Sequence, residues 1–168
     1  MKLSVYMAAV VDSVASTGER TGRQMVLAVD CSEQGNDAVA DYAVVANHIE
    51  NHGAALSAKT VDKSYIGEGD STLKTSTQRT FDVAGQLLRG DDFHDFINSH
   101  AIKYGVGSEI KRKYVYFDPG TGDGETGTLS IIVNKDGAAA AGDPADIDVR
   151  LAVDGTPEEY EYSGGSST

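Results

Sequence analysis

The residues best suited to metal chemistry are two histidines four positions apart, in His48-Ile-Glu-Asn-His52. On a helix this spacing brings both imidazole rings to one side, where they can bind zinc. The zinc-protease pattern requires a glutamate directly after the first histidine, and Ile49 occupies that position. The surrounding residues favour strand and loop, in which the two rings do not meet. We therefore interpret the pair as surface histidines and expect no metal or other cofactor.

A glycine-rich segment, Gly120-Thr-Gly-Asp-Gly124, has the composition of a phosphate-binding loop. No Lys-Ser or Lys-Thr follows it, and the next segment favours a strand, so no helix N-terminus would meet a phosphate. Three carboxylates around it, Asp118, Asp123 and Glu125, are oxygen ligands of the kind that calcium prefers, but their spacing matches no EF-hand loop. The interpretation that we favour is an acidic hairpin loop.

Nucleophilic catalysis finds no support in the local sequence. No serine lies in a Gly-x-Ser-x-Gly elbow, and Cys31 has no basic neighbour that would favour its thiolate. Arg89-Gly-Asp91 spells an integrin-type tripeptide, but these are common residues at the start of an expected helix. We expect no enzyme, although a triad assembled from distant residues stays open.

Length and charge narrow the function classes. The 168 residues predict one domain, with 1–40 as a candidate N-terminal arm or loop region and 163–168 as a flexible tail. Lys and Arg number 14 against 26 Asp and Glu, a net charge of −12. This balance disfavours nucleic-acid binding, which depends on cations that neutralise phosphates. It suits either a surface past which DNA slides or ordinary solubility. The single cysteine excludes an internal disulfide, and no apolar run approaches the ~20 residues of a membrane helix.

The last third of the chain predicts three β-strands, because it is rich in β-branched and aromatic residues. In the third strand, apolar and mostly charged residues alternate, which indicates one dry face and one wet face. The strands are Ile110–Phe117, Thr128–Val133 and Asp146–Asp154; the dry face is Ile147, Val149, Leu151 and Val153, and the wet face includes Asp146, Asp148, Arg150 and Asp154.

The earlier segments predict further strands and one helix. The apolar run Val5–Val11 is interpreted as a first strand, since its charged region is too weak for a signal peptide. The segment Ser57–Gly67 is polar on both faces, which is expected of an edge strand or of one covered by another subunit. Further strands are expected at 25–29, 42–46 and 73–87, with a bulge at Gly85; the helix is expected at 93–104, with Asp92 as N-cap, Gly105 as its stop and an apolar face of Phe93, Phe96, Ile97, Ala101 and Tyr104. The predicted fold is mainly β, an antiparallel β-sandwich or barrel with one flanking α-helix (about 92–104) and long glycine-rich loops at 118–127 and 136–144.

The order of these features resembles the major tail tube proteins of long-tailed, non-contractile (siphovirus-type) bacteriophages. The resemblance covers about residues 42–157. It rests on the polar section Ser57–Gln86, the Asp-rich helix Gly90–Tyr104, the basic-aromatic strand Ile110–Phe117, the Gly-Thr-Leu-Ser-Ile-Ile-Val strand and the terminal Asp-Val-Arg-Leu-Ala-Val-Asp-Gly-Thr-Pro157 segment.

The resemblance implies a structural virion protein that forms hexameric rings, which stack into a hollow tube for genome ejection. The implied partners are further copies of the chain and the tape measure, tail terminator and distal tail proteins; DNA passes through without specific binding, and no membrane is involved. The implied location is the virion tail, after assembly in the host cytoplasm. Our candidates for the lumen are Asp62, Asp82, Asp146 and Asp148, and our candidates for the subunit interface are Ala58, Thr60, Tyr65, Ile66, Lys111, Arg112 and Lys113.

Two other classes stay open at this stage. A secreted β-sandwich that binds carbohydrate or a cell surface would use the same strands and acidic loops, with calcium at Asp118, Asp123 and Glu125. It should carry a convincing export signal. A small β-fold enzyme would need titratable groups that converge in a pocket.

Overall fold

The computed structural model describes residues 1–10, 17–33, 35 and 38–163. The expected loop between 12 and 23 and the expected tail from 163 therefore lie partly outside the described residues. The strands are β1 (Val26–Val29), β2 (Ala43–Val44), β3 (Ile49–Tyr65), β4 (Gly69–Gln86), β5 (Lys111–Phe117), β6 (Asp123–Ala138) and β7 (Asp146–Glu161). The helices are α1 (Leu3–Val10), α2 (Asp92–Ile97) and α3 (His100–Tyr104), with single 3-10 turns η2 (Gly22–Gln24), η3 (Val39–Asp41) and η4 (Gly107–Ile110).

The seven strands of the described chain form one antiparallel sheet in the order β2-β1-β5-β6-β7-β4-β3. Strands β2 and β3 lie at opposite edges of this sheet, yet β3 begins at Ile49, only five residues after β2 ends at Val44. Five residues span at most about 18 Å, whereas seven strands laid flat would separate the edges by roughly 29 Å. The sheet must therefore curve until its edges approach each other. This confirms a mainly β, antiparallel, sandwich-like fold.

Two hydrophobic clusters lie on the two faces of the curved sheet. The larger one fills the concave side, where residues of both ends of the strand order meet, such as Leu27 in β1 and Phe81 in β4. The smaller one lies on the other side of β1 and β5, under α1, and includes Met7, Val115 and Phe117. Strand β1 is buried at all four positions because it has a cluster on each face. All four dry-face residues predicted for β7 are buried, as expected.

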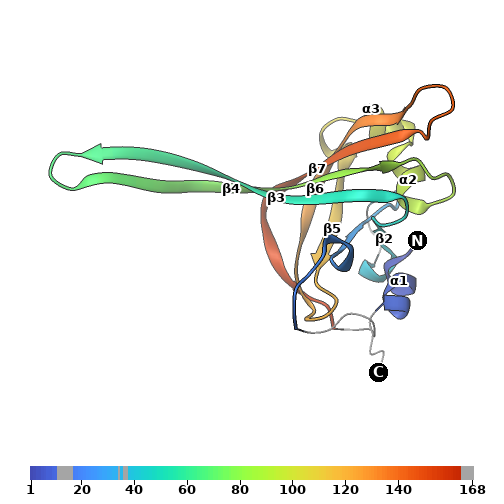
Figure 1. Ribbon diagram of the computed structural model, residues 1–168, viewed down its shortest axis with the longest axis horizontal. Coiled ribbons are helices and arrows are strands. Elements are labelled where there is room, and N and C mark those ends of the chain that lie inside the picture. Colours follow the sequence, from blue (N-terminus) through green and yellow to red (C-terminus); the bar gives the residue numbers. More distant parts are fainter. Residues whose placement is uncertain (11–16, 34, 36–37, 164–168) are drawn as a thin grey trace.

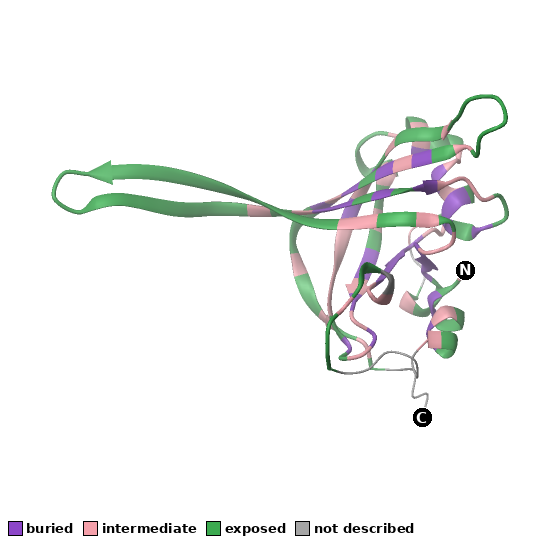
Figure 2. Cartoon of the chain, in the orientation of Figure 1, coloured by how far each residue is buried: buried purple, intermediate pink, exposed green. Residues whose placement is uncertain are grey.

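A long two-stranded ribbon leaves this body. Strands β3 and β4 pair with each other from Ile49 to the turn after Tyr65, but β4 pairs with β7 only over Thr80–Gln86. Figure 1 shows the remainder projecting far from the other strands. Residues 54–76 are exposed throughout, in contrast to the buried root of β4 (Figure 2). The expected edge strand at 57–67 is confirmed, and it belongs to a hairpin that the other described residues do not cover.

The predicted glycine-rich loop at 118–127 is wrong in its second half. Strand β6 already begins at Asp123, and Gly124 lies opposite Phe117 in the ladder. A Cβ at Gly124 would overlap the backbone of Tyr116 and Phe117. The glycine therefore permits a close approach of two strands and does not mark a flexible loop. In the same way β6 continues to Ala138, into the second predicted loop.

The first apolar run is a helix, α1, and the predicted strand there is wrong. Short apolar runs do not distinguish the two by periodicity. Leu3 and Met7, four residues apart on one helical face, are both buried, and Ala, Met and Leu are good helix formers. The helix is tied to the body by the hydrogen bond from Leu3 N to Tyr42 O at 2.8 Å.

The predicted helix at 93–104 is interrupted. Asn98 and Ser99 separate α2 from α3, and the Asn98 side chain donates to His94 O at 3.0 Å, an alternative to continuing the helix. The N-cap is Asp91, not Asp92, since the Asp91 carboxylate accepts from Phe93 N. Gly105 is the C-terminal residue as expected. The break changes the phase of the apolar face: Phe93, Ile97 and Ile102 are buried, whereas Ala101 and Tyr104, which we placed on that face, are exposed.

Gly85 allows the two strands at the root of the ribbon to come together. The β3–β4 register shifts between Ile49 and Asn51, opposite Gly85 and Ala84. The irregularity expected at Gly85 is therefore present, with the extra residue on the partner strand. A Cβ at Gly85 would overlap the carbonyl of His48 and the Cα of Ile49.

We predict that Gly85→Ala destabilises the protein by about 1–3 kcal/mol, because the two backbones must separate. Gly53→Ala is the matched control, since a Cβ at Gly53, in the same ribbon, finds ordinary contacts of 3.5 Å or more. The control should lie within about 0.5 kcal/mol of the wild type. Urea unfolding followed by circular dichroism measures both, and equal stability of the two variants would contradict this account.

Candidate functional site

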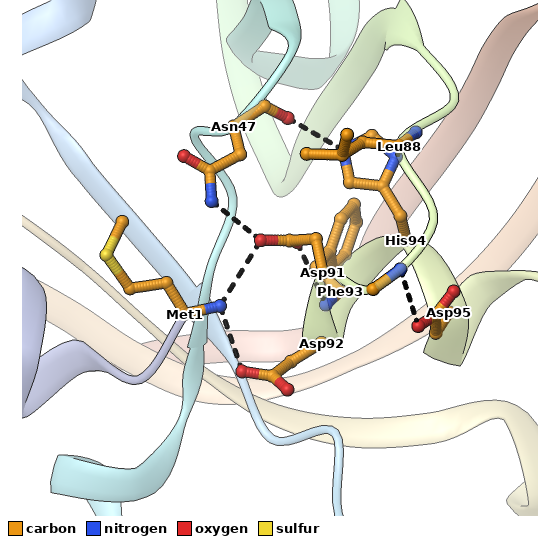
Figure 3. A network of polar contacts seen from close by, with 9 residues as sticks. Met1, Asn47, Leu88, Asp91, Asp92, Phe93, His94 and Asp95 are labelled. Carbon is orange, nitrogen blue, oxygen red and sulfur yellow. Dashed lines mark hydrogen bonds and ion pairs between the residues drawn. The ribbon is translucent and has the colours of Figure 1, made fainter.

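Polar groups gather around Asp91, where α2 meets the chain between β2 and β3 (Figure 3). The Asp91 carboxylate accepts from Asn47 Nδ2 at 2.7 Å, from Phe93 N at 3.3 Å and from the Met1 ammonium at 3.3 Å. Asp92, which is exposed, holds the same ammonium at 2.9 Å. Burial alone would raise the pKa of Asp91, but the hydrogen bond from Asn47 and the charge of Met1 outweigh it and hold that pKa below its ordinary value.

His94 is fully buried beside this network, and both of its ring nitrogens have backbone partners. Nδ1 lies 3.4 Å from Leu88 N, which donates to it, and Nε2 lies 2.7 Å from Asn47 O (Figure 3). The imidazole therefore joins three segments of backbone and presents no free nitrogen to a substrate or metal. The network stabilises the packing of α2 against the body.

The other residues that suggested chemistry are not brought together. Asp118 pairs with Arg20 at 2.5 Å and Glu125 pairs with Arg79 at 2.7 Å, so the three carboxylates considered for calcium do not share one site. His48 is exposed, and His52 Nε2 lies 3.2 Å from Met25 O. Burial raises the pKa of the Cys31 thiol, which disfavours the thiolate. Within the described residues, no group of three His, Cys, Asp or Glu side chains is placed to hold a metal ion.

Arg79 fixes the root of the ribbon. It donates to Glu125 Oε1 at 2.7 Å, and its guanidinium carbon lies 5.0 Å from the centre of the Phe81 ring and 5.1 Å from that of Tyr116. Tyr114 donates its hydroxyl to the same Glu125 oxygen at 3.2 Å. Burial, with the nearby charge of Glu125, raises the pKa of Tyr114, so the hydroxyl stays protonated. This cluster joins β4 to β5 and β6 at the point where the ribbon leaves the sheet.

The ladder divides the exposed ribbon into two different faces. Residues paired across an antiparallel ladder share a face, and the register shift between Lys59 and Thr60 keeps Val61 opposite Leu73 and Asp62 opposite Thr72. One face carries Lys59, Val61, Lys63 and Tyr65 with Ser71, Leu73 and Ser76; the other carries Ala58, Thr60, Asp62 and Ser64 with Asp70, Thr72, Lys74 and Thr77. The first face is basic and apolar and has no acid; the second is polar and of mixed charge.

The four residues proposed for a lumen do not form one patch. Asp82, Asp146 and Asp148 share the outward face of β4 and β7, because Asp82 pairs with Arg150, Ala84 with Asp148 and Gln86 with Asp146 in the ladder. Asp82 also lies 3.8 Å from the Arg150 guanidinium. Asp62 lies on the ribbon, roughly 33 Å from Asp82 along β4, and the register places it on the opposite face.

The residues proposed for an interface fall into two groups. Ala58, Thr60, Tyr65 and Ile66 are all exposed in the ribbon. In the basic cluster, Lys111 pairs with Asp154 within the subunit at 2.8 Å, and Lys113 is exposed. Arg112 lies over the Phe96 ring at 5.2 Å and donates to two backbone carbonyls of its own turn.

No sequence motif singled out Arg79 or the acidic pair Glu158 and Glu159, and Glu125 was considered only as a calcium ligand. Arg79 lies two residues before the buried Phe81, and a cation so close to the core was a signal for a partner of opposite charge. Its partner Glu125 lies 46 residues away, and no local pattern connects the two.

We predict that Asp91→Asn costs about 2 kcal/mol of stability near neutral pH, since hydrogen bonds to a buried charge are lost or weakened. Asp92→Asn, in the exposed neighbour, should cost less than 1 kcal/mol. The folded-state pKa of Asp91 is depressed, so its contribution is present above the ordinary value of 3.8 and is lost as pH falls through the folded pKa. Urea unfolding from pH 7 to pH 2 should show the deficit of Asp91→Asn shrinking with acid; a deficit independent of pH would contradict the assignment.

Comparison with known proteins identifies the fold. No family model matches the chain, and no curated protein matches its sequence. No helix in the described part of the chain is long and apolar enough to cross a bilayer.

A chain from the tail of an empty gene transfer agent particle, with C6 symmetry, has a similar structure. The TM-score is 0.59 at 13% sequence identity, and the match covers 86% of this chain and 100% of that one. A chain from the virion of a native gene transfer agent particle gives a TM-score of 0.55 at 14% identity, over 84% and 98%. The chain thus shares its fold with protein chains of gene transfer agent particles, one of them a chain of the particle's tail.

Proposed function

We propose that this chain is a structural subunit of a phage-like tail, which self-assembles into hexameric rings that stack into a tube for genome ejection. The observation that carries the proposal is the shared fold with a chain of a C6-symmetric tail, matched over that chain's whole length. The chain would act without catalysis or cofactor, in a virion tail of the non-contractile type. Its partners would be further copies and the tape measure, terminator and distal tail proteins, after assembly in the host cytoplasm.

The exposed ribbon supports self-association. Its apolar side chains are uncovered in the single chain: Val61 is 42% exposed, Tyr65 49%, Leu73 66%, and Ile66 at the turn is fully exposed. A lone two-stranded ribbon is marginally stable in water, and exposed edges invite pairing with another chain. Contact with a neighbouring copy would cover these groups, and repetition of one such contact around a six-fold axis closes a ring.

We predict that the purified protein forms rings or hollow tubes as its concentration rises. A variant in which Asn-Gly replaces residues 58–77 joins Ser57 to Gln78, which are opposite each other in the ladder, by a tight hairpin turn. This variant should keep its cooperative unfolding, because the buried core lies outside the removed residues, and should stay monomeric. Light scattering after size exclusion and negative-stain electron microscopy measure assembly. A wild-type chain that stays monomeric at every concentration would count against the function.

The outward face of β4 and β7 is our candidate lining of the channel, with Asp82, Asp146 and Asp148 repelling DNA phosphates. We predict that tubes of Asp82→Lys with Asp148→Lys retain short duplex DNA in a salt-dependent manner, whereas wild-type tubes do not. A control of equal net charge, Glu33→Lys with Asp143→Lys, changes exposed residues outside this face.

Fluorescence anisotropy of labelled duplex in assembled tubes measures this retention. Equal retention of DNA by the control and the test variant would contradict the placement of Asp82 and Asp148 in the channel. Asp62→Lys tests the ribbon residue separately. If tubes of this variant retain no more DNA than wild-type tubes, Asp62 does not line the channel.

A further inference from the structure

Among the described residues, strand β7 has a sheet partner on only one side over its second half. Its pairing with β4 ends at Ala152, whereas its pairing with β6 continues to Glu161. Strands β4 and β7 separate near a bend in β7. At this bend the ladder with β6 is irregular, because Asp154 pairs with Thr128 and Glu158, four residues later, pairs with Thr126, only two residues earlier in β6. Gly155, with φ of 72°, adopts the left-handed conformation that this bend requires. The result is a fork between the ribbon and the free edge of β7, and such an edge can accept another strand.

Acidic side chains line this fork. A cavity of about 420 Å³ lies between the ribbon root and β7, and Leu56, Arg79, Glu125, Pro157, Glu158 and Glu159 are among its lining residues. The charge of Arg79 is already matched by Glu125 at 2.7 Å. Glu158 and Glu159 are exposed, and the described residues provide neither with an ion pair. Successive residues of a strand point to opposite faces, and the ladder places Glu159 on the face of Glu125 and Glu158 on the face of Thr126. The edge of β7 therefore carries one unmatched negative charge on each of its faces, and the apolar surface of Leu56 and Pro157 lies beside it.

The basic and apolar face of the ribbon has the complementary character. Lys59 and Lys63 lie on it with Val61, Tyr65 and Leu73, and no acid shares the face. Two copies of the chain repel each other on average, because each carries a net charge of −12. A basic and apolar face on one copy is attracted to an acidic and partly apolar surface on another, and the fork is such a surface. The ribbon points away from its own body (Figure 1), so the fork that receives it belongs to a second copy.

We propose that the ribbon of one copy docks in the fork of a second copy, with Lys59 and Lys63 toward Glu158 and Glu159 and with Val61 and Leu73 over Leu56 and Pro157. The inference rests on the proposed self-assembly and specifies its contact. Donor and receiving surfaces differ, so the contact is heterologous and passes from copy to copy. Each exposed ion pair contributes little by itself, and the contact gains its strength from the apolar area and from repetition around the assembly.

Charge exchange between the two surfaces tests this docking. Lys59→Glu with Lys63→Glu should raise the concentration needed for assembly at least tenfold. Glu158→Lys with Glu159→Lys should do the same, although it makes the chain, with its net charge of −12, less negative and would otherwise favour association. The variant with all four substitutions should return to within threefold of the wild type. Lys74→Glu with Lys135→Glu, which changes the opposite face of the ribbon and an exposed site on β6, is the control and should also stay within threefold.

Light scattering over a concentration series gives these thresholds, and circular dichroism verifies that each variant is folded. Assembly of both paired variants at the wild-type threshold overturns the docking and leaves the proposed function in place, because the wild type still assembles. Failure of the fourfold variant to recover, or a control as impaired as the test variants, overturns the pairing of these two surfaces. If the wild-type chain never assembles, both the proposed function and the docking are contradicted.

Discussion

The structure depends on where the pairing of β4 with β7 stops. Seven residues of β4, Thr80–Gln86, pair with β7, and the remainder of the strand has only β3 as a partner in the described part of the chain. The sheet side of this limit carries the buried residues Thr80, Phe81 and Val83, whereas residues 54–76, farther out on the ribbon, are exposed to solvent throughout. The chain thus combines a closed body with a ribbon whose apolar side chains have no cover in the monomer. That division is the physical reason to expect assembly.

The body is built to hold the ribbon in one direction. Curvature brings the two sheet edges together, so that β2 and β3 are joined by only a few residues. At the exit point, the Arg79 guanidinium lies over two aromatic rings, Phe81 and Tyr116, and is paired with the carboxylate of Glu125. An ion pair of this kind adds little to stability, because desolvation offsets the attraction between the charges. The ion pair instead fixes the direction in which the ribbon leaves the body, since a planar guanidinium fits its partners in one orientation.

Much of the fold was predictable, because alternation of side chains is a local property. The buried face of β7 and the exposed two-faced strand at the sheet edge followed from the alternation of side chains, and β5 followed from its aromatic and β-branched residues. The structure confirms all three. The errors arose where local signals are ambiguous. Residues 5–11 are apolar without a decisive period, and α1 forms because Leu3 and Met7 find a core to pack against. The glycines of β6 resembled loop residues because glycine also occurs where two strands approach closely.

The sequence by itself determined the strand content, the acidity and the lack of local catalytic motifs, because these depend on composition and on neighbours along the chain. Only the tertiary structure decided that 54–76 leave the sheet, that Asp62 and Asp82 lie on different faces, and that Glu158 and Glu159 line a fork beside Leu56. These are matters of register and of where a ladder ends. A shift of one residue in register moves a side chain to the other face. The length of the β4–β7 ladder depends on bends such as that at Gly155 and on partners that are 60 to 72 residues apart in the sequence.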